Sequence, residues 1–151
     1  MASFVSQQIP LSSVSRDFSR ADLEFFGVDH SGPSFEARVF FNNQEATVTT
    51  PRSAEQGYVG SFFIFGHGGC AGDVGHCEIP VERRTYDRRP PHQLTPTRRL
   101  VIVTDSLRRL LEQGEESLVV SVVPSTSRPG TKNDSDVLSI DRVSLLLYAW
   151  P

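Results

Sequence analysis

The sequence predicts an all-β protein, mainly an antiparallel β-sandwich, with one short α-helix. Short runs rich in Phe and Val recur along the chain, and clusters of Gly, Pro, Asn and Asp separate them. Runs of this kind are typical of strands, and the clusters between them are typical of turns. Only one segment repeats its apolar residues with helical spacing, so the chain lacks the regular alternation of strands and helices that accompanies a parallel sheet.

Six segments carry the strand pattern. They combine β-branched and aromatic residues with flanking turn residues, and they span residues 23–30, 35–43, 58–66, 99–104, 117–124 and 137–148. The letters SGPS between the first two predict that these strands are neighbours in a hairpin. The stretch after the third is too rich in proline for a helix, so residues 78–99 are expected to form an ordered crossing loop.

The expected helix covers residues 105–113. Thr104 or Asp105 can cap its start, and Gly114 can supply a left-handed residue at its end. One face of the helix carries three leucines, Leu107, Leu110 and Leu111. That face is therefore expected to pack on the sandwich.

Chain length limits the number of domains, and net charge limits the classes of binding partner. A chain of 151 residues fits one domain, which we place at residues 21–151, after an N-terminal arm or linker at residues 1–20 with no clear periodicity. The formal net charge of −3 supplies no field that favours nucleic acid or an anionic membrane. The sequence also shows no apolar run of membrane-spanning length and no signal-peptide pattern, so we expect a cytoplasmic protein.

The stretch GHGGCAGDVGHC, residues 66–77, holds two of the four histidines and both cysteines. Two imidazoles and two thiols suit Cu(I) or Zn(II), so one interpretation is a metal site with the ligands His67, Cys70, His76 and Cys77. A second is a disulfide between the two cysteines, and a third is a loop of packed thiols and histidines. Its glycines are interpreted as residues that allow positive φ angles. The third interpretation is favoured because the ligand spacing does not match that of structural zinc sites.

Other candidate groups have simpler explanations. A thiol of Cys77 activated by His76 and Asp73 also needs an oriented base and an oxyanion site, which the sequence does not supply. His30 is interpreted as a turn histidine with local hydrogen bonds, and His92 as a packed loop residue. We therefore predict no catalytic residue.

Four stretches carry a resemblance to a known family: FFGVDHSGPSFEARVFFNN, GYVGSFFIFGHGGCAGDVGHCEIP, RPPHQLTPTRRLVIVTDSLRRLL and DRVSLLLY. Over about residues 21–148 the chain resembles the C-terminal β-sandwich domain of bacterial tyrosinases and plant-type polyphenol oxidases. In that family a helical catalytic domain holds two copper ions through histidines, and the C-terminal domain packs over the entrance to the copper site. The resemblance covers only the second part.

The resemblance implies a non-catalytic accessory or interaction domain. Such a domain would dock on a tyrosinase-like copper oxidase, shielding its active site or assisting its folding or copper loading. The four histidines and one short predicted helix of this chain do not provide the ligand set of a dicopper centre, so we expect no phenol oxidation by the chain itself. The alternative function is a small metal-binding protein (Cu or Zn), or a thiol-based catalyst, that uses the Gly/His/Cys stretch.

Overall fold

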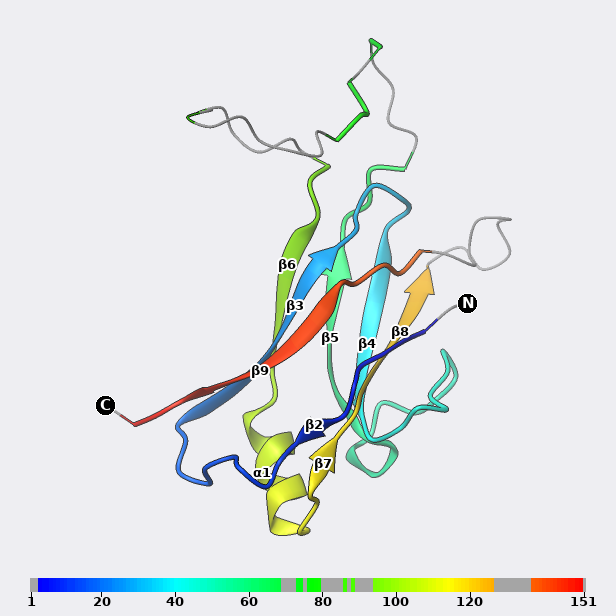
Figure 1. Cartoon of the computed structure of the whole chain (residues 1–151). Helices are drawn as coiled ribbons and strands as arrows, with labels where there is room; N and C mark the ends of the chain where they lie inside the picture. The colour runs from blue at the N-terminus through cyan, green and yellow to red at the C-terminus, as the bar shows by residue number, and fades with distance from the viewer. Residues whose placement is uncertain are drawn as a thin grey trace.

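The computed structural model describes residues 3–68, 73–74, 76–79, 86, 88, 94–126 and 137–150. It confirms the predicted fold class, since antiparallel sheets dominate and one α-helix is present in this part of the chain (Figure 1). The elements in chain order are β1 (Phe4–Val5), β2 (Ile9–Pro10), β3 (Arg20–Val28), β4 (Phe35–Phe41), η1 (Ala54–Gln56), β5 (Tyr58–Ile64), β6 (Thr97–Ile102), α1 (Thr104–Glu112), β7 (Ser117–Leu118), β8 (Val120–Thr126) and β9 (Arg142–Tyr148).

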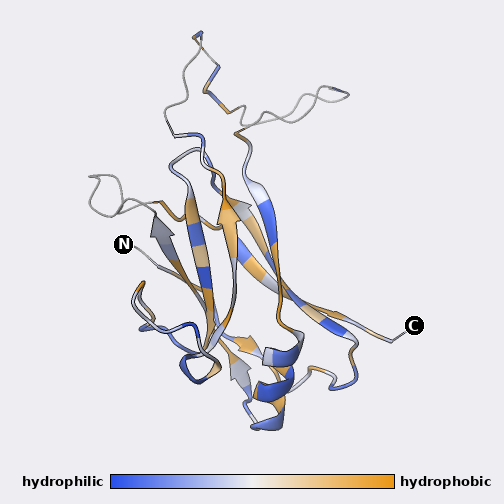
Figure 2. Ribbon diagram, turned by 180° about the vertical axis from the view of Figure 1, so that it is seen from behind, coloured by the Kyte–Doolittle hydropathy of each residue, from blue (hydrophilic) through white to orange (hydrophobic). Residues whose placement is uncertain are grey.

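Two sheets enclose the core. One has the strand order β1-β8-β4-β5 and the other β6-β3-β9, while β2 and β7 form a separate short pair. Alternate residues of the central strand β3 point inward, so Ala21, Leu23 and Phe25 are fully buried. The Phe25 ring meets that of Phe62 from the opposite sheet, with centroids 5.0 Å apart. Figure 2 shows hydrophobic residues along the strands of both sheets, as expected where each contributes one face to a shared interior.

The predicted hairpin between the first two long strands is wrong. β3 pairs with β6 and β9, whereas β4 pairs with β5 and β8. The connection through residues 29–34 therefore carries the chain from one sheet to the other. Both strands occupy inner positions in their sheets, where strands distant in sequence satisfy their backbone groups on both sides.

The N-terminal segment docks on the sandwich. β1 pairs with β8 and β2 pairs with β7, although each pairing involves only two residues of the arm. Leu11 and Phe18 are buried in the main core, with 3% and 2% of their surface exposed. Arg108 of α1 donates a hydrogen bond of 3.0 Å to the carbonyl oxygen of Phe18. Residues 3–20 are thus held by the same core as the strands.

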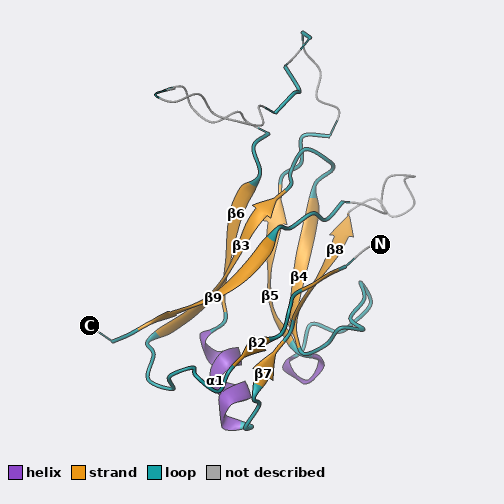
Figure 3. Cartoon of the chain, viewed as in Figure 1, coloured by secondary structure: helices purple, strands orange, loops and turns teal. Residues whose placement is uncertain are grey.

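The helix is confirmed at Thr104–Glu112, and it stands with η1 at one end of the sandwich (Figure 3). Leu107 and Leu111 are buried, and Gly114 has a φ of 78° just after the helix, as predicted. The predicted cap is wrong, since the N-cap position is Val103 and no side-chain cap bond is made. The Thr104 hydroxyl instead accepts a hydrogen bond from the Ala21 N–H. Within the described residues, no helix has the length and apolar character needed to cross a membrane.

The outer face of the β6-β3-β9 sheet carries two buried acids. Asp22 is fully buried and Glu24 is 8% exposed, although both point away from the core. Arg20 pairs with Asp22 at 2.7 Å, and Arg98 pairs with Glu24. The hydrogen bond to Asp22 raises the pKa of Arg20, although partial desolvation opposes that change. The two arginines thus pair with carboxylates whose cross-strand neighbours are mostly aliphatic, namely Ile102 and Leu146 opposite Asp22 and Leu100 opposite Glu24.

Candidate functional site

The connection from β3 to β4 and the segment after β5 lie at the end of the sandwich opposite α1 (Figure 1). Each segment carries one histidine, and the two side chains meet. His67 lies just after β5, and His30 lies in the connection from β3 to β4. Their Nδ1 atoms are 3.2 Å apart, and their rings meet edge to face with centroids separated by 5.0 Å. Both side chains are half-buried, so water can reach the pair. We call His30 and His67 the histidine pair.

Backbone contacts hold the two segments together. The His67 N–H donates to the His30 carbonyl oxygen at 2.9 Å, and the Gly66 N–H donates to the Ser34 hydroxyl at 3.0 Å. A Cβ atom at Gly66 would overlap the backbone of Gly32 and Pro33. The chain therefore needs glycine here for close approach. The predicted role of Gly66 and Gly68 as positive-φ residues is wrong, because neither has a positive φ.

The hydrogen bonds define the tautomers of the neutral pair. His30 Nε2 lies 2.9 Å from the carbonyl oxygen of Thr95, which can only accept, so this nitrogen carries the proton. His30 Nδ1 then presents a lone pair to His67, and His67 Nδ1 is the donor between the rings. The carbonyl oxygen of His30, 3.4 Å from His67 Nδ1, can share the same proton.

Two exposed phenylalanine rings lie on the segment that leads to His67. Phe63 and Phe65 expose 69% and 81% of their surface, whereas Phe62 before them and Ile64 between them are buried. The two-residue period of the strand explains this alternation. The Phe65 ring also contacts that of His67 edge to face, with centroids 6.0 Å apart. An aromatic surface therefore adjoins the histidine pair.

The predicted metal ligands are not brought together in the described residues. His67 contacts His30, which was not among the predicted ligands. Cys70 lies outside the described residues, as does His92. His76 and Cys77 are described. Cys77 is disulfide-bonded, so its sulfur is not a thiolate ligand and the favoured interpretation of packed thiols is wrong for this residue. No group of three His, Cys, Asp or Glu side chains that could hold a metal occurs in the part of the chain that the structure describes.

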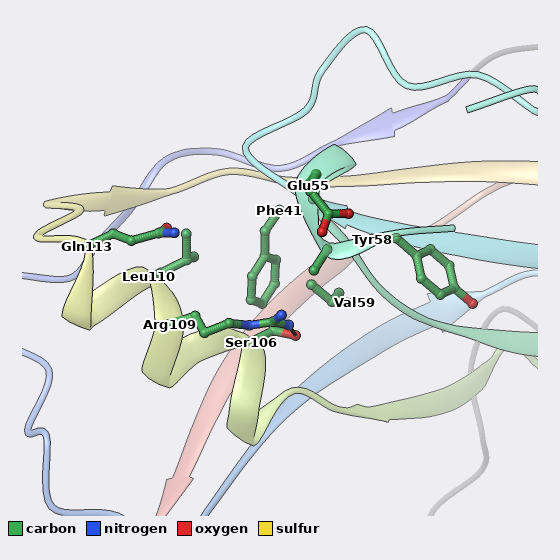
Figure 4. Close-up of a pocket in the computed structure, with 10 residues that line it drawn as sticks. Phe41, Glu55, Tyr58, Val59, Ser106, Arg109, Leu110 and Gln113 are labelled. Carbon is green, nitrogen blue, oxygen red and sulfur yellow. Dashed lines mark hydrogen bonds between the residues drawn. The ribbon is translucent and has the colours of Figure 1, made fainter. Parts of the chain in front are cut away.

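A separate pocket lies at the other end of the sandwich, between α1 and β5. It has a volume of about 250 Å³, and Figure 4 shows Ser106 and Arg109 of α1 beside Glu55 and Phe41. The pKa of Glu55 is lowered by a hydrogen bond from Ser53, by its own backbone and by the charge of Arg109. No sequence pattern pointed to this pocket, because its residues come from four separate elements, β4, η1, β5 and α1.

The lowered pKa of Glu55 gives a direct test. We expect Ser53→Ala to raise the pKa of Glu55 toward its ordinary value, because the largest stabilising contact of the carboxylate is lost. A lowered folded-state pKa favours the folded state above the ordinary pKa, and this contribution is lost as the pH falls through the folded-state value. Titration of the Glu55 carboxyl carbon by NMR measures the change. An unchanged pKa in the variant would assign the effect to the backbone and Arg109 instead.

Comparison with known proteins identifies the fold. No protein-family model matches the chain, and no curated protein matches it. Among solved structures, recombinant latent aurone synthase, a polyphenol oxidase, co-crystallized with hexatungstotellurate(VI) and soaked in H2O2, matches with a TM-score of 0.58 and 16% sequence identity. That match covers 99% of this chain and 25% of the other. Latent aurone synthase from its natural source matches with a TM-score of 0.56 and 19% identity, covering 99% and 25%.

The TM-scores establish a shared fold, and the chain spans about a quarter of the length of the polyphenol oxidase chains. The long strands, the docked N-terminal segment and the helix all fall within the match, since it covers 99% of this chain. The chain therefore has the fold of one part of a plant polyphenol oxidase, in agreement with its resemblance to the C-terminal β-sandwich domain of that family.

Proposed function

We propose that this chain is a non-catalytic module that docks on a tyrosinase-like copper oxidase and shields the entrance to its copper site. The supporting observation is that almost the whole chain matches about a quarter of polyphenol oxidase chains. Those chains are of the latent enzyme, which fits a module that withholds activity. The module acts in the cytoplasm, and help with folding or copper loading of the oxidase is a further role of the same contact.

The docking surface in this proposal is the aromatic pair Phe63 and Phe65. Exposed aromatic side chains are enriched at the energetically dominant positions of protein interfaces. A second apolar surface lies on the other sheet, where Leu100 and Ile102 expose 52% and 60% of their area. The aromatic pair is favoured because its two rings are larger and more exposed. Phe63 lies on β5, an edge strand of its sheet, and Phe65 follows directly after that strand.

Binding to an oxidase that lacks such a domain tests the proposal. We expect the wild-type chain to form a complex with a tyrosinase-like oxidase from the same host and to slow its oxidation of phenols. The double variant Phe63→Ser/Phe65→Ser is expected to weaken binding by about tenfold or more, since two exposed aromatic contacts are lost. Isothermal titration calorimetry and oxidation rates measure the two effects.

The matched control is Leu100→Ser/Ile102→Ser, which removes apolar surface from the other sheet. It is expected to leave binding unchanged. If binding is weaker in this control and unchanged in the aromatic variant, the docking surface lies on the β6-β3-β9 sheet instead. Absence of any complex or any change in oxidation rate would reject the docking function.

A further inference from the structure

We propose that the histidine pair, His30 and His67, is a binding site for a divalent ion of borderline softness, Zn²⁺ or Cu²⁺, held between the two Nδ1 atoms. This site shares His67 with the ligand set expected from the sequence and adds His30 from a different segment. It involves no cysteine. It does not depend on the docking function, because the isolated chain carries both ligands.

The separation of the two nitrogens fits one ion. Zinc–imidazole bonds are about 2.0–2.1 Å long, so two imidazole nitrogens on a tetrahedral ion lie about 3.3–3.4 Å apart. The Nδ1 atoms of the histidine pair are 3.2 Å apart. The ion therefore needs only a small outward shift of the rings, and it takes the place of the proton that now lies between them.

His30 is already oriented as a metal ligand. Its Nε2–H donates to the Thr95 carbonyl oxygen, which fixes the ring and leaves the Nδ1 lone pair directed at His67. Metal-binding histidines characteristically donate the other ring N–H to a carbonyl or carboxylate in this way. The orientation that binding requires is thus present before the ion arrives.

His67 becomes the second ligand by a change of tautomer. Its proton moves from Nδ1 to Nε2 through solvent, which reaches this half-buried side chain. The neutral ring then offers a second Nδ1 lone pair, and the exchange releases no net proton. The backbone hydrogen bond from His67 to His30 keeps the two segments in place during this change.

The number of protein ligands indicates whether the site is structural or reversible. Two protein nitrogens leave the remaining positions of the ion to water, and no third ligand side chain gathers within the described residues. Structural zinc sites have four protein ligands, so we infer a reversible site that is not required for folding. Imidazole nitrogen disfavours hard cations, and Mg²⁺ and Ca²⁺ are therefore excluded.

Metal titration of the isolated chain tests the site. We expect calorimetry with ZnCl2 to show one ion per chain, and MgCl2 to show no binding. His30→Gln and His67→Gln are each expected to weaken Zn²⁺ affinity by about tenfold or more, the scale seen when a metal site loses one supporting group. The control is His76→Gln, which also removes one histidine but lies outside the pair, and we expect its affinity to match that of the wild type.

A second measurement uses the wild-type chain, so it tests the site even if a variant fails to fold. In the wild-type chain, Zn²⁺ is expected to shift the imidazole ¹⁵N resonances of His30 and His67 and to leave those of His76 in place. Loss of affinity in His76→Gln but not in His30→Gln would overturn the proposal in favour of ligands from the Gly/His/Cys stretch. Absence of Zn²⁺ binding would also overturn it, whether or not the chain docks on an oxidase.

Discussion

Replacing Phe25 with alanine is expected to lower the free energy of unfolding by about 3–5 kcal/mol. Phe25 is fully buried on the central strand β3, and its ring packs against Phe62 of the opposite sheet at a centroid distance of 5.0 Å. Alanine removes this ring contact between the two sheets and leaves a cavity between them. Urea denaturation followed by circular dichroism measures the loss.

Phe63→Ala is the matched control, because it makes the same chemical change on an exposed side chain. We expect its stability to stay within about 0.5 kcal/mol of the wild type. Equal losses in the two variants would contradict the assignment of Phe25 to the core and of Phe63 to the surface. The same control separates folding from docking, since Phe63→Ala is expected to weaken binding to an oxidase without unfolding the chain.

The sequence predicted the strands better than it predicted their pairing. All six predicted strands and the helix are present, because alternation, turn residues and helical spacing are local signals. The hairpin from β3 to β4 was wrong because pairing depends on distant partners, and β3 finds one of its two in β9, where Leu23 lies opposite Leu145. A run of turn residues shows where a strand ends and does not show which sheet the next strand joins.

The candidate site was found only in part for the same reason. The density of His, Cys and Gly drew attention to His67, and nothing in the local sequence linked it to His30, 37 residues earlier. His30 does form hydrogen bonds, as interpreted, but its partners are His67 and Thr95, and neither is local. Periodicity likewise could not predict that the N-terminal arm docks, because the arm is held by single buried residues such as Leu11 and Phe18.

Gly66 is the residue on which the geometry of the candidate site depends most directly. It lies between β5 and His67, and its missing side chain lets the backbone approach Gly32 and Pro33. We expect Gly66→Ala to lower the free energy of unfolding by about 2–3 kcal/mol, because the added Cβ overlaps backbone atoms that cannot rotate away. Alanine also lowers the conformational entropy of the unfolded chain, which by itself stabilises the folded state by about 0.4–1 kcal/mol. The energetic cost of the clash is therefore larger than the net loss of stability.

Gly68→Ala is the control, because its added Cβ would face the same Gly32 carbonyl oxygen at 3.2 Å, a distance that a small adjustment relieves. We expect the stability of this variant to stay within about 0.5 kcal/mol of the wild type. The two variants should also differ at the site, since displacing residues 66–67 breaks the hydrogen bond from the His67 N–H to the His30 carbonyl. Amide hydrogen exchange at His67 measures this directly. Fast exchange in Gly66→Ala together with slow exchange in Gly68→Ala would show that close backbone approach holds the histidine pair together, and equal exchange in both would show that the pair forms without it.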